Sequence, residues 1–115
     1  MKPAYNEKLS KLIAAGSPNI RDMLVAQKTW IEGLLSFRDV RKTALKHVIE
    51  AAELSDAVCT IQEADAVASE VADCMILLLD ICYLYGLDPV DVFYAKLKVN
   101  QERTWKSSNG SLTHE

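Results

Sequence analysis

Apolar positions recur at helical spacing along most of the chain, and short polar stretches containing Gly or Pro interrupt them. The segment "SPN" at 17–19 offers Ser17 or Asn19 as a helix cap, and Gly86 is a stop signal. Asp88 and Pro89 then provide a cap and a first helical residue. We expect four main helices at residues 20–35, 40–58, 65–86 and 89–105, after a short amphipathic helix at residues 5–15.

Strand signals are missing from the pattern. No segment shows period-two alternation, and no hairpin dipeptide lies between two apolar runs. We therefore predict an all-α fold, a bundle of four main helices with an extra short N-terminal helix. A single domain is expected over residues 1–105, and the polar residues 106–115 are expected to form a flexible tail.

The predicted third helix contains a long apolar run that Asp73 and Asp80 interrupt. A membrane-spanning helix needs about 20 apolar residues, and a charge at the bilayer centre costs roughly 2.5–3.5 kcal/mol. The run therefore fits the core of a bundle, and an interface between copies of the chain, better than a membrane. We expect no membrane contact.

Composition narrows the class of protein further. The chain has 115 residues and a net charge of −3, so its charge does not indicate a nucleic-acid partner. Three cysteines without a C-x-x-C pair, and an N-terminus without a long apolar segment, predict a reducing, cytoplasmic setting. A short chain gains core by oligomerisation, so we expect self-association as a homodimer or homotetramer.

Two pairs of acids stand out because small and apolar residues surround them. Glu50 and Glu53 are three residues apart, which places them about 60° apart on one helix face. Glu70 and Asp73 have the same spacing on the next helix. The 16 residues between Glu53 and Glu70 are enough to turn the chain back. The two pairs can then face each other across antiparallel helices.

Four carboxylates in one dry cleft cannot all stay ionised without compensation, so they either take up protons or hold cations. All-oxygen ligands suit Mg²⁺, which a few carboxylates, water and substrate phosphates usually bind together. The alternative is that each pair is an ordinary solvated helix face. A di-iron site needs Glu-x-x-His motifs, and neither His47 nor His114 follows a glutamate at that spacing.

Cationic and amide side chains lie on one face of the fourth helix. Lys96, Asn100 and Arg103 are spaced i, i+4, i+7, and Lys46 stands four residues before Glu50. Such groups bind phosphate oxygens when they lie beside a metal site. The alternative is that they are ordinary surface charges.

Three blocks of residues follow one another along the chain: Lys46, Glu50 and Glu53; Glu70 and Asp73; Lys96, Asn100 and Arg103. Their order resembles that of the MazG-like all-α nucleoside triphosphate pyrophosphohydrolases, and in particular of the dATP/dGTP diphosphohydrolase branch. The resemblance covers about residues 20–105. It implies a Mg²⁺ enzyme, with Mn²⁺ as a possible substitute, that hydrolyses a (d)NTP to the monophosphate and pyrophosphate in nucleotide-pool house-cleaning. By motif position it implies that the metal ligands are Glu50, Glu53, Glu70 and Asp73, and that the phosphate or sugar contacts are Lys46, Lys96, Asn100 and Arg103.

The resemblance also implies a mechanism in which a metal-activated water attacks the α-phosphorus, with Glu50 or Glu53 as the general base. Base contacts are placed near Trp30 and Phe37, for which core packing is the alternative. Asp80 either orients Lys96 or Arg103, or is a paired interior aspartate.

A different class of function is compatible with the same fold. The chain could be a non-catalytic helical module that binds a nucleotide or a protein. Against this, a pure scaffold has no reason to bury four negative charges.

Overall fold

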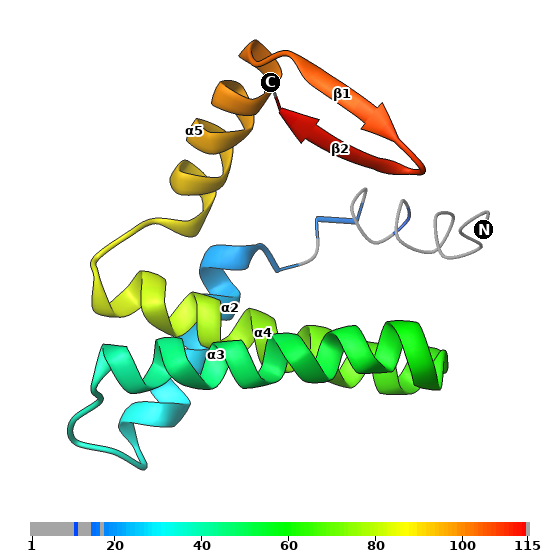
Figure 1. Cartoon of the computed structure of the whole chain (residues 1–115). Helices are drawn as coiled ribbons and strands as arrows, with labels where there is room; N and C mark the ends of the chain where they lie inside the picture. Colours follow the sequence, from blue (N-terminus) through cyan, green and yellow to red (C-terminus); the bar gives the residue numbers. More distant parts are fainter. Residues whose placement is uncertain (1–10, 12–14, 17, 115) are drawn as a thin grey trace.

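The computed structural model describes residues 11, 15, 16 and 18–114. These residues contain the four predicted main helices, so the prediction of an all-α fold is confirmed (Figure 1). They also contain a π-helical turn and a small hairpin that the sequence pattern did not predict. The short helix predicted at residues 5–15 lies largely outside the described residues. The elements are α2 (Ile20–Glu32), α3 (Val40–Asp56), η1 (Ala57–Ile61), α4 (Ala64–Leu84), α5 (Pro89–Glu102), β1 (Trp105–Ser108) and β2 (Ser111–His114).

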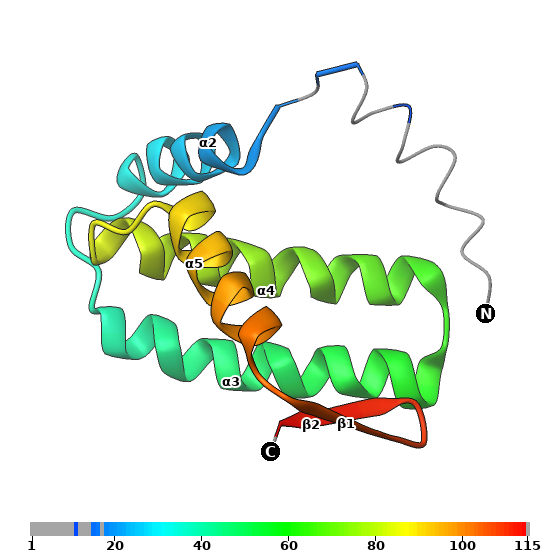
Figure 2. The same ribbon diagram turned by 90° about the horizontal axis from the view of Figure 1, so that it is seen from above.

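The long helices α3 and α4 run antiparallel and lie side by side, as Figure 2 shows. Asp39 begins α3 by accepting a hydrogen bond from the backbone N–H of Arg41 at 3.0 Å. α3 ends at Asp56, close to the predicted residue 58, and the chain continues as the wider π-helical turn η1 to Ile61. Gln62 then adopts a left-handed backbone (φ 60°), which reverses the chain before α4.

Helix α2 begins as predicted and ends earlier than predicted. The side chain of Asn19 accepts from the backbone N–H of Asp22, and the Asp22 side chain accepts from the backbone N–H of Asn19, both at 3.0 Å. This capping box satisfies two N–H groups that a helix start leaves free. The helix ends at Glu32, before Gly33, instead of near residue 35.

The interior of the single chain is small. Among the described residues, Ala57, Cys74, Leu79, Asp80 and Pro89 are buried, and three of these five belong to α4. The apolar run of the third helix therefore supplies core, as the sequence predicts. In the described part of the chain, no helix combines the length and apolar character that crossing a membrane requires.

Helix α5 leaves the α3–α4 pair and packs against α2 (Figure 1). Asp88 caps α5 by accepting from the backbone N–H of Val90 at 2.9 Å, and Pro89 is the first helical residue, both as predicted. Arg21 of α2 binds the same Asp88 carboxylate at 2.9 Å, which lowers the pKa of Asp88. The start of α5 is thus tied to α2.

The prediction that residues 106–115 contain no strand is wrong. β1 and β2 pair antiparallel, with Trp105 opposite His114 and Ser108 opposite Ser111. Asn109 and Gly110 turn the chain with φ values of 49° and 80°, a backbone that the Asn-Gly dipeptide favours in tight hairpins. The sequence rule failed because it required apolar runs beside the dipeptide. Helix α5 ends at Glu102, not near residue 105, because the backbone of Arg103 is already extended and Trp105 begins β1.

Candidate metal centre

Three acids from two helices meet at the α3–α4 interface. Glu50 and Glu53 from α3 and Glu70 from α4 each place one carboxylate oxygen within 4.8 Å of the others. The antiparallel pairing brings them together, because the turn at Gln62 sets the end of α3 beside the start of α4. Among the described residues, this is the one group of His, Cys, Asp and Glu side chains close enough to share a metal ion.

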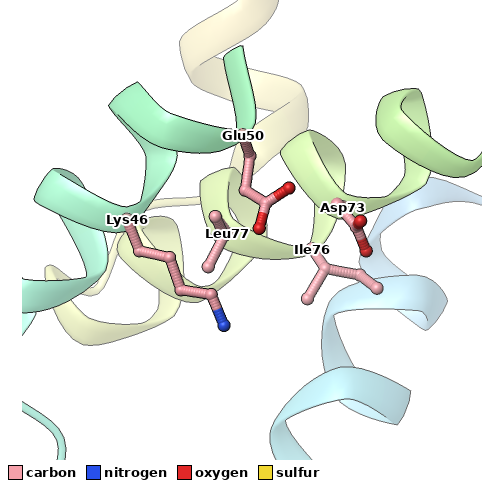
Figure 3. A pocket seen from close by; sticks show the side chains of 5 residues that line it. All are labelled: Lys46, Glu50, Asp73, Ile76 and Leu77. Atoms are coloured by element: carbon pink, nitrogen blue, oxygen red, sulfur yellow. The ribbon is translucent and has the colours of Figure 1, made fainter. Parts of the chain in front are cut away.

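Asp73 lies one turn along α4 from Glu70 and is outside that closest group. It lines a cavity of about 70 Å³ together with Glu50. In Figure 3 the carboxylates of Glu50 and Asp73 reach toward the same space from facing helices. The cavity is completed by Lys46, Ile76 and Leu77. Lys46, predicted as a phosphate contact, therefore borders the acids.

The electrostatics of the cluster are unfavourable for anions alone. The oxygens Glu50 Oε2 and Glu70 Oε2 are buried and have no hydrogen-bond partner. Burial raises the pKa of both glutamates above the ordinary 4.5, and the neighbouring carboxylate of Glu53 raises both further. Orphaned buried oxygens and mutual repulsion are both relieved by a cation. The carboxylate-only donor set fits a hard divalent ion such as Mg²⁺ or Mn²⁺.

Cys74 is buried beside the cluster but does not belong to it. Burial raises the pKa of its thiol, and the negative charge of Glu50 raises it further. A protonated thiol is a poor metal ligand and packs as a small apolar group. The site is therefore built from oxygen ligands.

The structure does not bring the predicted residues of α5 to this cavity. Lys96 and Arg103 are exposed, Asn100 is half-buried, and none of them lines the cavity. The reason is the direction of α5, which is tied to α2 and points away from the α3–α4 pair (Figure 1).

Trp30 and Phe37, predicted as base contacts, also lie outside the cavity. Their exposed fractions are 62% and 80%, so the alternative of core packing within the single chain is wrong. α2 contains no buried residue at all. Both aromatic rings are free to contact another molecule.

Sequence reasoning offered a paired interior aspartate as one alternative for Asp80, but it did not find the partner of that carboxylate. Asp80 is buried and forms an ion pair with Arg38, so it is a paired interior aspartate and does not orient Lys96 or Arg103. The sequence does contain a signal for the partner of Asp80. Antiparallel helices place the residues before α3 beside the end of α4, and a buried acid needs a cation.

Comparison with known proteins adds independent information. No family model matches the chain. Two curated phage relatives are both named dATP/dGTP diphosphohydrolase. The protein of Cyanophage S-2L is 44% identical over 46 residues, which is 39% of this chain and 44% of that protein. The protein of Salmonella phage PMBT28 is 33% identical over 104 residues, which is 90% of this chain and 34% of that protein. The chain thus spans less than half the length of these relatives.

A solved structure matches over most of both chains. It is the Cyanophage S-2L MazG-like pyrophosphohydrolase, bound to dGDP and three catalytic Mn²⁺ ions per active site. The TM-score is 0.70 at 28% identity, and the match covers 85% of this chain and 94% of the other. The resemblance found in the sequence motifs is confirmed. Over most of its length the chain is thus similar to a MazG-like pyrophosphohydrolase, and its two curated relatives are both named dATP/dGTP diphosphohydrolase.

Proposed function

We propose that this protein is a Mg²⁺-dependent nucleoside triphosphate pyrophosphohydrolase that converts a (d)NTP to the monophosphate and pyrophosphate. The observation that carries the proposal is the cluster of Glu50, Glu53 and Glu70 with its two unpartnered buried oxygens. The names of the similar phage proteins, and the dGDP and Mn²⁺ bound by the solved neighbour, support it.

The metal would be held by Glu50, Glu53 and Glu70, with Asp73 joining from across the cavity. When bound, Mg²⁺ supplies positive charge against the triphosphate and acidifies the attacking water. Mn²⁺ has the same preference for oxygen ligands and substitutes for it.

The chain's own residues supply the remaining chemistry. The water oxygen bonds to the α-phosphorus, the bond from that phosphorus to the bridging oxygen breaks, and pyrophosphate leaves. Glu50 or Glu53 accepts the proton of the water. Burial raises the pKa of Glu50, which matches that carboxyl better to neutral pH. Lys46, at the cavity edge, neutralises a phosphate oxygen.

Self-association is the second part of the proposal, as a homodimer or homotetramer. Large apolar side chains are exposed on both α3 and α5, among them Leu45, Ile49, Phe93 and Leu97. Association of copies covers such surface.

A second copy also gives the predicted substrate contacts a place to act. Because α5 points away from the acids of its own chain, it can reach the acids of another copy. The proposed contacts to phosphate, sugar or base from such a copy are Lys96, Asn100, Arg103, Trp30 and Phe37.

The test is a panel of the eight standard nucleoside triphosphates with and without Mg²⁺, with products separated by chromatography. We expect metal-dependent formation of monophosphate and pyrophosphate. Glu53→Gln should abolish turnover at unchanged fold, whereas Glu63→Gln, just before α4 and outside the cluster, should leave it intact. Nucleoside diphosphate plus phosphate as products, or no turnover of any nucleotide, would contradict the proposal.

A further inference from the structure

The two helices that carry the acids, as far as the structure describes them, pack against each other without an ion pair between them. α3 and α4 pack along their lengths, yet among the described residues no ion pair joins a side chain of α3 to one of α4. Their facing polar groups are instead the carboxylates of Glu50, Glu53 and Glu70, which repel one another. Without a cation, this repulsion disfavours the close approach of the two helices.

An ion pair joins the chain just before α3 to the C-terminal part of α4. Arg38, just before the α3 cap Asp39, forms an ion pair with Asp80 of α4. The side chains are only 9% and 7% exposed, respectively. Because solvent does not screen a buried pair, this link persists at high salt.

Further contacts fix the guanidinium group of Arg38. A second carboxylate, that of Glu32 at the end of α2, lies 3.9 Å from it. The ring of Tyr83 lies 5.3 Å from the guanidinium carbon, and the Tyr83 hydroxyl donates to Glu32 at 2.7 Å. Arg38 is thus held by three side chains from two helices, which leaves it little freedom to move.

The link lies on the same face of α4 as Asp73, which lines the cavity with Glu50. Asp80 follows Asp73 by seven residues, which is two helical turns, so both project from one face of α4 about 10 Å apart. A shift of α3 along α4 would break the Arg38–Asp80 pair and would also separate Glu50 and Glu53 from Glu70. The pair and the acid cluster therefore depend on one helix register.

We propose that Arg38 and Asp80 are positioning residues for the metal centre, which hold α3 in the register that sets Glu50 and Glu53 opposite Glu70 before any metal binds. The inference rests on the proposed metal role of these acids. A buried ion pair adds little net stability compared with apolar packing, and its best-attested use is to fix register. The pair preorganises the ligands against their own repulsion.

The test compares Asp80→Asn with a matched control, Arg21→Gln. The control breaks the exposed Arg21–Asp88 pair, which ties α2 to α5 and not α3 to α4. Mn²⁺ affinity is measured without nucleotide, by electron paramagnetic resonance titration of folded protein. We expect Asp80→Asn to weaken Mn²⁺ binding about tenfold or more, as loss of a residue that orients ligands does, and Arg21→Gln to leave it unchanged.

A second readout needs no metal. In metal-free protein, Asp80→Asn should shift the amide resonances of Glu50, Glu53 and Glu70, while Arg21→Gln should not. Asp80→Glu keeps the charge and should restore both readouts in part. If Asp80→Asn does not fold, Arg38→Lys, which keeps the charge but loses the planar fork, replaces it in the same comparison.

The outcomes separate the two proposals. Unchanged Mn²⁺ affinity and unchanged acid-cluster resonances in a destabilised variant would overturn the positioning role and leave a merely structural pair. If the wild-type protein binds no Mn²⁺, the metal site fails, and the amide shifts alone still decide whether Asp80 sets the register.

Discussion

Glu50 sits where its own charge is disfavoured. One of its oxygens is buried without a partner, and Glu53 and Asp73 add like charge from α3 and α4. The spacing of the two acid pairs predicts that these residues meet. It does not predict that Asp73 lies outside the closest group, because that depends on the exact rotation of α4 against α3.

The disfavoured charge of Glu50 predicts that the stability of the metal-free protein depends on pH. The pKa of Glu50 is raised in the folded state, so folding favours its protonated form. Stability is then intact below the ordinary value of 4.5 and falls as pH rises through the raised pKa. Glu50→Gln removes this loss. Its melting temperature relative to the wild type should therefore increase as pH rises from about 4 to 8.

The measurement is thermal unfolding across that pH range in the presence of a chelator. Glu63→Gln, outside the cluster, should track the wild-type curve. Saturating Mg²⁺ should reverse the order, because it stabilises the ionised wild-type site. A constant difference between Glu50→Gln and wild type at all pH values would show that Glu50 is not strained by its charge.

At the scale of elements, local sequence signals predict where the helices begin, but they do not always predict where the helices end. Asn19, Asp39 and Asp88 each cap a helix through side-chain chemistry that the sequence displays. The π-helical turn η1 and the left-handed Gln62 carry no such signal. The dipeptide Asn109-Gly110 is a signal for the hairpin turn. The strands beside it lack the apolar alternation by which a strand is recognised in a sequence, so the hairpin was not predicted.

At the scale of the whole molecule, the direction of α5 decides how a complete site could form. Nothing in a single sequence fixes whether a helix folds back on its own bundle or onto another copy. Here the contact of Arg21 with Asp88 and the packing against α2 hold it away from the acids. Lys96 and Asn100 lie on α5, whereas Arg103 follows its last residue with an extended backbone. Their proposed role is to act on another copy of the chain.

A mixing experiment tests this arrangement. Glu53→Gln lacks an acid and Arg103→Ala lacks a proposed substrate contact just after α5, so each variant alone should be inactive. If α5 acts on another copy, a hybrid dimer contains one site with both groups intact. An equimolar mixture, exchanged by mild denaturant and refolding, should then recover about a quarter of wild-type turnover. If each chain completes its own site, the mixture stays inactive.

The most direct test of the central claim is where the oxygen of water goes. The protein is incubated with dATP and Mg²⁺ in ¹⁸O-labelled water, and the ¹⁸O content of each product is determined by mass spectrometry. Attack at the α-phosphorus puts the label in the monophosphate and leaves pyrophosphate unlabelled, which is the result we predict. Label in pyrophosphate, or equal product formation without a divalent metal, would contradict the account.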